Sequence, residues 1–208
     1  MKGKGVLTVV SGFSGTGKGT VTKALARDYS QYVLSVSATT RKPRNDEREG
    51  VEYYFMDNAA FEKMIAEDAF YEYAGYVDHY YGTPKAFVDE QLAAGKDVIL
   101  EIELQGALKI KKQIPDCLMI FLIPPSAKEL ERRLSGRGTE EKEVIQARLR
   151  RAVEEADGAE AYDYIVVNDD LETCISCVHQ LIQDAHCRAA GRLKLVQDIK
   201  NDLIEMVK

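Results

Sequence analysis

The feature that most constrains the fold is a glycine-rich stretch at residues 12–20, which reads GFSGTGKGT. A short apolar run over residues 5–11 precedes it, and a helical pattern over residues 21–28 follows it. Glycines accept backbone conformations in which successive N–H groups turn inward, and the start of a helix adds positive charge. The order strand, glycine loop, helix therefore predicts a cradle for a phosphate group.

The loop departs at one position from the pattern G-x-x-x-x-G-K-[ST] of nucleotide-binding proteins. Lys18 supplies the cation that reaches the β and γ phosphates, but Gly19 stands where the pattern has a hydroxyl that ligates Mg²⁺. We therefore expect Mg²⁺ to be held by nucleotide phosphate and water, without a direct protein ligand, near Thr20, Glu101 and Glu103. The residues of the loop expected to bind the nucleotide are Gly12, Phe13, Ser14, Gly15, Thr16, Gly17, Lys18, Gly19 and Thr20.

Further apolar runs predict a parallel sheet. They are near-continuous rather than alternating, as is typical of strands covered on both faces, and lie at residues 32–36, 98–102, 118–123 and 164–167. Helical patterns occupy residues 84–94, 105–113, 127–135 and 172–190, the first with Thr83 as N-cap and Pro84 at its first position. This alternation predicts an α/β fold of three layers, with helices on both faces and ligands at the carboxyl ends of the strands.

The chain length fits a single domain with two inserted parts. The core is expected to comprise residues 1–36, 84–126 and 158–190. Residues 37–83 interrupt it as an α+β lobe with short strands at 53–56 and 70–76, and residues 127–157 as an arginine-bearing lid. Residues 191–208 predict a last helix, packed on the body or on another subunit.

Composition limits the partners. The 208 residues carry a formal net charge of −6, so no overall field attracts nucleic acid or a membrane surface. No segment approaches the roughly 18 apolar residues of a membrane span, and the N-terminal run is too short for a secretory signal. We expect small-molecule substrates, neither nucleic acid nor a membrane as partner, and a cytoplasmic location.

Four cysteines, at positions 117, 174, 177 and 187, need an interpretation. Cys174 and Cys177 with the nearby His186 resemble a zinc set in their spacing, but they fall within one amphipathic helical pattern. We interpret the cysteines as core or near-core residues of a reduced protein rather than as metal ligands.

The lobe carries groups suited to a second nucleotide. Arg41, Arg44 and Tyr53 lie within one short stretch and could grip a phosphate. Glu72 and Thr83 are polar groups in aromatic surroundings. A carboxylate with a hydroxyl suits the N1–H and N2–H₂ donors of guanine, whereas the unprotonated N1 of adenine would repel the carboxylate.

Several motifs together resemble the guanylate kinases, which pass the γ-phosphate of ATP to GMP. They occur in family order over about residues 5–190 and read SGFSGTGKGT, SVSATTRKPR, GVEYYF, YYGTP, LEIELQGA, IFLIPPS, RRLSGRGTE and IVVND. Two features depart from the common form: Thr83 stands where serine is common, and Glu101 and Glu103 stand where aspartates are common.

The resemblance implies roles for individual residues. The GMP site would comprise Ser37, Arg41, Arg44, Tyr53, Glu72, Tyr81, Thr83, Glu101 and Glu103. In that set Arg41, Arg44, Tyr53 and Tyr81 would hold the phosphate, while Ser37, Glu72, Thr83 and Glu103 would read guanine. The catalytic set would be Lys18, Arg41 and the lid residues Arg133, Arg137 and Arg148. Asn168 and Asp170 would lie near the adenine of ATP.

Two alternatives remain. One is a kinase of the same architecture that acts on another nucleoside monophosphate. The other is a protein-binding module of guanylate kinase type without catalysis, against which the retained Lys18, Arg41, Arg44 and Arg137 argue. The sequence leaves open whether the protein is a monomer or a homodimer.

Overall fold

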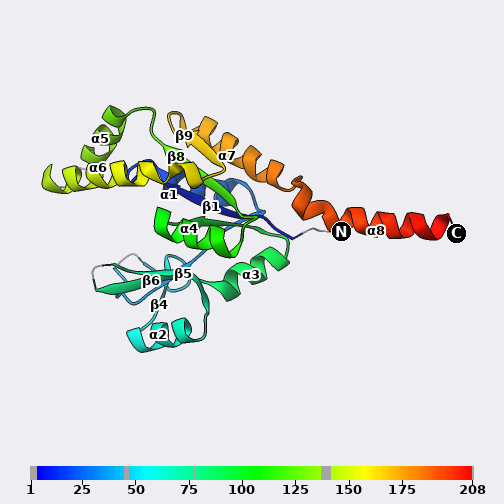
Figure 1. Cartoon of the computed structure of the whole chain (residues 1–208). Coiled ribbons are helices and arrows are strands. Elements are labelled where there is room, and N and C mark those ends of the chain that lie inside the picture. Colours follow the sequence, from blue (N-terminus) through cyan, green and yellow to red (C-terminus); the bar gives the residue numbers. More distant parts are fainter. Residues whose placement is uncertain (1–3, 45–46, 77, 137–141, 208) are drawn as a thin grey trace.

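The structure is a computed structural model that describes residues 4–44, 47–76, 78–136 and 142–207. Its larger sheet has five parallel strands in the order β2-β7-β1-β8-β9 (Figure 1). The predicted parallel sheet is confirmed, with each strand within two residues of its expected bounds. The strands are β1 (Leu7–Gly12), β2 (Tyr32–Leu34), β7 (Asp97–Glu101), β8 (Leu118–Ile123) and β9 (Tyr164–Val167).

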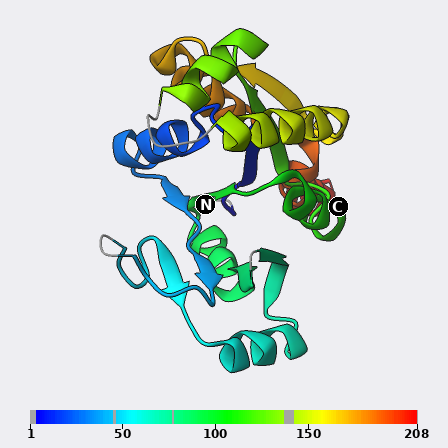
Figure 2. The ribbon, with the colours of Figure 1, turned by 90° about the vertical axis from the view of Figure 1, so that its left-hand side faces the viewer.

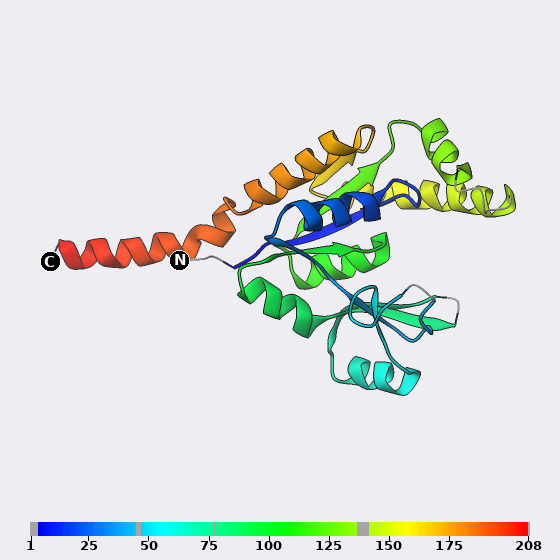
Figure 3. The same cartoon turned by 180° about the vertical axis from the view of Figure 1, so that it is seen from behind.

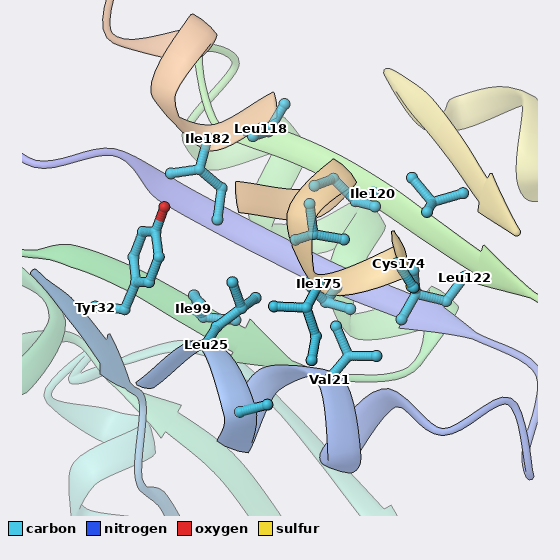
Figure 4. Close-up of a cluster of buried hydrophobic side chains, with 14 residues drawn as sticks. Val21, Leu25, Tyr32, Ile99, Leu118, Ile120, Leu122, Cys174, Ile175 and Ile182 are labelled. Carbon is cyan, nitrogen blue, oxygen red and sulfur yellow. The ribbon is translucent and has the colours of Figure 1, made fainter. Parts of the chain in front are cut away.

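Helices cover both faces of this sheet. On one face, α1 (Lys18–Asp28) and α7 (Leu171–Ala185) pack against the strands through a buried cluster drawn in Figure 4. There, Leu25 and Ile182 come from the two helices and Ile99 and Ile120 from the sheet. On the other face lie α3 (Lys85–Ala93) and α4 (Leu104–Gln113).

The interior strand β8 explains why the apolar runs are continuous. Its side chains alternate between the two faces, so Ile120 and Leu122 join the cluster under α1 and α7. Met119 and Phe121 join the cluster under α3 and α4. Both faces are buried, and both therefore require apolar residues.

The inserted lobe, residues 37–83, forms its own four-stranded sheet below the core in Figure 2. One helix, α2 (Asn58–Ala66), covers it through Phe61, which is fully buried and stacks on Phe70. The order is β4-β3-β6-β5, formed by β3 (Ser37–Thr39), β4 (Tyr53–Phe55), β5 (Phe70–Tyr76) and β6 (His79–Pro84).

The start of α3 differs from the prediction. Thr83 and Pro84 belong to β6, and the helix begins at Lys85 with Pro84 as its N-cap. The reason is that Thr83 pairs with Glu72 across β5 and β6 and so continues the strand to the helix. The expected capping role of Thr83 is wrong.

Two helices form the lid, α5 (Ala127–Ser135) and α6 (Lys142–Asp157). They pack on each other through Leu130, Leu134 and Ala152. A short 3-10 turn, η1 (Ala159–Ala161), then leads into β9. The segment between the two lid helices contains Arg137 and lies outside the described residues.

The helix predicted over residues 172–190 is two helices. It ends at Ala185, and α8 (Ala189–Met206) begins after a break. At the break, His186 Nε2 lies 2.9 Å from Oδ1 of Asp97, whose side chain is buried at the start of β7. This contact ties the end of α7 to the sheet.

Helix α8 projects from the body, as Figures 1 and 3 show from opposite sides. Every residue of α8 is exposed, among them Val196, Ile199 and Leu203. The expectation that this helix packs on the body is therefore wrong, because nothing in the described part of the chain covers its apolar side. Packing on another subunit stays a prediction.

The cysteines take several environments. Cys117 and Cys174 are buried in the two core clusters, while Cys177 and Cys187 are exposed. Burial raises the pKa of the Cys117 and Cys174 thiols to about 11. Within the described ranges, no helix is both long and apolar enough to cross a membrane.

Candidate functional site

The phosphate loop links the carboxyl end of β1 to the start of α1. Gly12, Gly15 and Gly17 have φ values of 144°, 91° and 88°, in the region that side chains disfavour. A Cβ at Gly12 would lie 2.1 Å from the Leu122 carbonyl oxygen, so the neighbouring strand also excludes a side chain there. The loop thus requires these glycines, and it leads into the N-terminus of α1, where an anion binds favourably.

Lys18 lies at the first position of α1 and folds back over the loop. Its Nζ donates to the carbonyl oxygens of Gly12 at 2.7 Å and Phe13 at 3.1 Å. A triphosphate would offer this ammonium group charged acceptors in place of two neutral ones. The predicted phosphate contact is therefore within the chemistry of the side chain as it is placed.

Gly19 faces an acidic side chain at the end of β7. A Cβ at this position would lie 3.4 Å from Oε2 and 3.5 Å from Oε1 of Glu101, and Thr22 donates to Oε2 at 3.2 Å. The carboxylate thus stands beside the position where the usual loop has its metal-ligating hydroxyl. Glu101, which the resemblance assigns to the GMP set, lies at the phosphate loop and fits water-mediated contact with Mg²⁺.

Asn168 and Asp170 follow β9, and each makes a contact with a different element, Asn168 with the phosphate loop and Asp170 with α7. Asn168 is 6% exposed, and its Nδ2 donates to the Thr16 carbonyl oxygen at 2.7 Å, which fastens the loop to β9. Asp170 is the N-cap of α7 and accepts from the backbone N–H of Thr173 at 2.9 Å. The structure thus gives both residues a structural task, and their contact with adenine stays a prediction.

A pocket of about 760 Å³ opens beside the loop. Its position between the starts of α1 and α7 suits a nucleotide whose phosphates occupy the loop. Its lining residues are Ser14, Gly15, Gly17, Lys18, Gly19, Thr20, Lys23, Ala24, Arg27, Glu101, Leu171, Glu172 and Ile175.

The lid arginines are unequally placed. Arg148 on α6 donates to Oγ of Ser14 in the loop at 3.4 Å, so one of the predicted residues reaches the phosphate site. Arg133 instead pairs with Glu129 of its own helix at 2.7 Å, and that carboxylate also binds Arg132. Together the two arginines lower the pKa of Glu129 to about 2. Arg137 lies outside the described residues.

In the lobe, two of the predicted phosphate-binding side chains, Tyr53 and Tyr81, lie near Arg41. Its guanidinium carbon lies 5.3 Å from the ring centroid of Tyr53, which is 6.0 Å from that of Tyr81. Nη1 and Nη2 of Arg41 each donate to an oxygen of Glu47 at 2.8 Å. The same carboxylate accepts from the backbone N–H of Arg44.

Glu47 is a residue that sequence reasoning missed. The Arg41 guanidinium, with the Arg44 N–H, lowers the pKa of Glu47 to about 2 and keeps it ionised. The signal was present as an acidic residue six positions after Arg41, but the loop between them is too irregular for spacing to predict a contact.

Glu72 and Thr83 face each other across β5 and β6. Thr83 is fully buried, and its Oγ1 donates to Oε1 of Glu72 at 2.7 Å. Burial raises the pKa of Glu72, and the nearby charge of Glu103 raises it further. The hydrogen bond from Thr83 and the charge of Lys109 lower the pKa and so oppose this rise. A carboxylate in this setting suits neutral N–H donors such as those of guanine.

Ser37 and Glu103 complete the set at the edges of this region. Ser37 begins β3, opposite Tyr53 in the sheet register. Glu103 is the N-cap of α4 but makes no capping hydrogen bond with its side chain. Its Oε2 accepts from Nη2 of Arg151 on the lid at 2.6 Å. The lobe, the core and the lid therefore each place residues near the predicted guanine site.

Comparisons with known proteins agree with this geometry. A family model described as guanylate kinase matches residues 4–185. A guanylate kinase of Caldanaerobacter subterraneus is 44% identical over 204 residues, covering 98% of this chain and 99% of that protein. A guanylate kinase of Thermus thermophilus is 48% identical over 194 residues, covering 93% of this chain and 86% of that protein. The crystal structure of guanylate kinase from Anaplasma phagocytophilum superposes with a TM-score of 0.72 at 31% identity, covering 90% of this chain and 89% of that one.

Proposed function

The chain belongs to the guanylate kinase family, and on that basis we propose that it transfers the γ-phosphoryl group of ATP to GMP, giving ADP and GDP. The observation that carries the proposal is a glycine-rich phosphate loop with Lys18, together with a partly buried carboxylate, Glu72, in the adjoining lobe. The loop supports a nucleoside triphosphate as the phosphoryl donor. The Glu72 carboxylate with Thr83 supports guanine as the base of the acceptor.

At the donor site, the loop N–H groups and Lys18 would hold the β and γ phosphates of ATP. Asn168 supports this arrangement because it fixes the loop from β9. Mg²⁺ bound with ATP would neutralise phosphate charge, and Glu101 with Thr20 would hold it through water. The fit rests on the Glu101 carboxylate, which stands beside Gly19.

At the acceptor site, Arg41, Arg44, Tyr53 and Tyr81 would hold the GMP phosphate. Glu72, Thr83, Ser37 and Glu103 would read the base. Arg41 must then exchange Glu47 for the phosphate, which is possible because a phosphate oxygen pair matches the same guanidinium edge.

In the transfer, an oxygen of the GMP phosphate attacks the γ-phosphorus in line with the leaving group. The bond from that phosphorus to the β–γ bridging oxygen breaks, and its electron pair leaves with ADP. The attacking oxygen is already ionised, so no general base is required. Lys18, Arg148 and the other predicted lid arginines would stabilise the charge of the group in transfer, while lid closure excludes water.

Replacement of Lys18 tests the catalytic part of the proposal. Lys18→Ala should lower kcat with ATP and GMP by about a hundredfold or more, since one charge that stabilises the transition state is lost. Thermal unfolding should change far less than kcat, because the hydrogen bonds of the side chain to the Gly12 and Phe13 carbonyls stay within the loop. Lys63→Ala, which removes an exposed lysine of α2, is the control. A near-wild-type rate in Lys18→Ala would remove the loop from the mechanism.

A further inference from the structure

The lid helix α6 contacts both predicted nucleotide sites through residues one turn apart. Arg148 Nη1 donates to Oγ of Ser14 in the phosphate loop at 3.4 Å. Arg151 Nη2 donates to Oε2 of Glu103, at the predicted guanine site, at 2.6 Å. Residues three apart lie on the same side of a helix, so a single helix face spans the donor and acceptor sites.

The Arg151 contact joins segments that are 48 residues apart in the chain. Glu103 caps α4 through its backbone position only, and its carboxylate makes no capping hydrogen bond. The side chain is therefore not held by its own helix, and Arg151 is the group that sets its direction.

Arg151 is itself held from a second side. Its Nε lies 3.5 Å from Oε1 of Glu155, which is one turn further along α6 and only 13% exposed. A guanidinium is planar with donors in fixed directions, so carboxylates at both Nε and Nη2 restrict its orientation. Such a group can hold Glu103 at a defined angle, which a flexible lysine could do less well.

The charges at the predicted guanine site favour such a partner. Glu103 is close enough to Glu72 to add to the rise in the pKa of that buried carboxyl. Two carboxylates that read one base repel each other, and a cation on the outer side of Glu103 offsets that repulsion. The positive charge of Lys109 likewise lowers the pKa of Glu72 and so favours its ionised form.

We propose that Arg151 is a positioning residue for GMP recognition, which holds Oε2 of Glu103 so that Oε1 can accept from guanine. Because Arg148 on the same helix reaches the phosphate loop, the contact also couples GMP binding to the lid. This inference rests on the proposed function, since it assumes that Glu103 reads guanine. The roles assigned to Lys18, Glu72 and Thr83 do not depend on it.

The test compares Arg151→Ala with Arg150→Ala in steady-state kinetics. Arg150 is the adjacent, exposed arginine of α6, so the control removes the same charge from the same helix without touching Glu103. Arg151→Ala should raise KM for GMP by about threefold to fivefold, the upper range for a solvent-exposed ion pair. It should change kcat by less than threefold, and Arg150→Ala should stay within twofold of wild type in both constants.

A double-mutant cycle with Glu103→Ala separates positioning from mere stability. If Arg151 acts through Glu103, then Arg151→Ala should add no further rise in KM when Glu103 is already alanine. The preference for GMP over IMP, which lacks the N2 amino group, should fall in Arg151→Ala and recover in part in Arg151→Lys. Fully additive effects of the two changes, or equal effects of Arg150→Ala and Arg151→Ala, would overturn the proposal.

Two outcomes distinguish this inference from the proposed function. If wild-type protein fails to phosphorylate GMP, the proposed function itself is wrong. If wild-type protein phosphorylates GMP and Arg151→Ala behaves as wild type toward both GMP and IMP, only the role of Arg151 is wrong. The coupling between GMP binding and the lid is measured as the ratio of the GMP affinities with and without a non-hydrolysable ATP analogue. This ratio should move toward one in Arg151→Ala. An unchanged ratio would overturn the coupling.

Discussion

Arg41 and Glu47 are joined by two hydrogen bonds of 2.8 Å, one from each terminal nitrogen of the guanidinium to a different carboxylate oxygen. A further bond from Nη1 reaches the Lys42 carbonyl oxygen. The edge of Arg41 that suits a phosphate is thus occupied by an internal anion. GMP must displace this anion to use Arg41.

Removal of the competing charge should therefore improve GMP binding. We expect Glu47→Gln to lower KM for GMP by about twofold to fivefold, the scale of one ion pair at a protein surface. Steady-state kinetics over a range of GMP concentrations measure the effect. Glu52→Gln is a suitable control, because Glu52 lies in the same loop and accepts only from the Arg48 backbone in the described part of the chain. An increase in KM would mean that Glu47 orients Arg41 for the phosphate instead.

Glu72 should link guanine recognition to pH. Burial raises its pKa above the ordinary value of 4.5, so the carboxyl gains its proton at a higher pH than an exposed glutamate. The protonated group accepts guanine donors less well, and KM for GMP should rise on acidification before exposed carboxylates titrate. In Glu72→Gln the acidic rise in KM should disappear, although KM is higher throughout. A wild-type KM independent of pH down to the ordinary carboxyl range would contradict this role.

The same carboxyl should reduce stability at neutral pH. A buried acid with a raised folded-state pKa stabilises the fold most when it is protonated, and that contribution is lost as pH rises through the folded-state value. Glu72→Gln keeps an oxygen for Thr83 and removes the buried charge. We expect its Tm at neutral pH to exceed that of wild type by about 2–4 °C, which is what ~1 kcal/mol produces in a chain of this size. The difference should shrink in acid, and calorimetry at both pH values would show it; a lower Tm at neutral pH would be the opposite result.

Glu101 should set the magnesium requirement. Its carboxylate stands beside Gly19 and is the acidic group nearest the missing hydroxyl. We expect Glu101→Gln to raise the Mg²⁺ concentration for half-maximal activity by about tenfold, since a neutral amide orients metal-bound water less well. Thr22→Val, which keeps the Glu101 carboxylate and removes the hydroxyl that donates to it and to the Gly19 carbonyl oxygen, should have a smaller effect. An unchanged Mg²⁺ dependence in Glu101→Gln would exclude this residue as the outer contact.

Asn168 should matter for the shape of the phosphate loop. Its buried Nδ2 donates to the Thr16 carbonyl oxygen, and Asn168→Ala would leave that oxygen without its partner. We expect a loss of ~1–3 kcal/mol in unfolding free energy. KM for ATP should rise more than KM for GMP, because the loop binds the donor. Equal changes in both constants would indicate a general loss of folded protein rather than a local effect.

The sequence predicted the core better than its edges, for physical reasons. Buried parallel strands such as Leu118–Ile123 need apolar residues on both faces, so their composition alone marks them. Thr83 looked like a helix cap because its hydroxyl precedes a proline, yet its partner is Glu72 across the sheet. A pairing between distant strands leaves no local signal in a single sequence. The break before α8 lies next to another such contact, that of His186 with Asp97.

The candidate site divides in the same way. Lys18 and the loop glycines could be assigned because a local backbone geometry requires them. Glu47 and Arg151 could not, because each acts through a contact that folding creates between separate segments or across an irregular loop. Asp170 shows the converse case, in which a residue of a recognised motif also has the ordinary task of capping a helix.

The most direct test of the central claim is the value of kcat/KM for phosphate transfer from ATP to GMP, AMP, CMP and dTMP, measured in one coupled assay with Mg²⁺ present. We predict that GMP exceeds each of the others by at least about a hundredfold, because Glu72 pairs with donors that only guanine presents in this set. We further predict that Glu72→Gln reduces the value for GMP alone. Comparable values for GMP and AMP in the wild-type protein would contradict the assignment of the acceptor site.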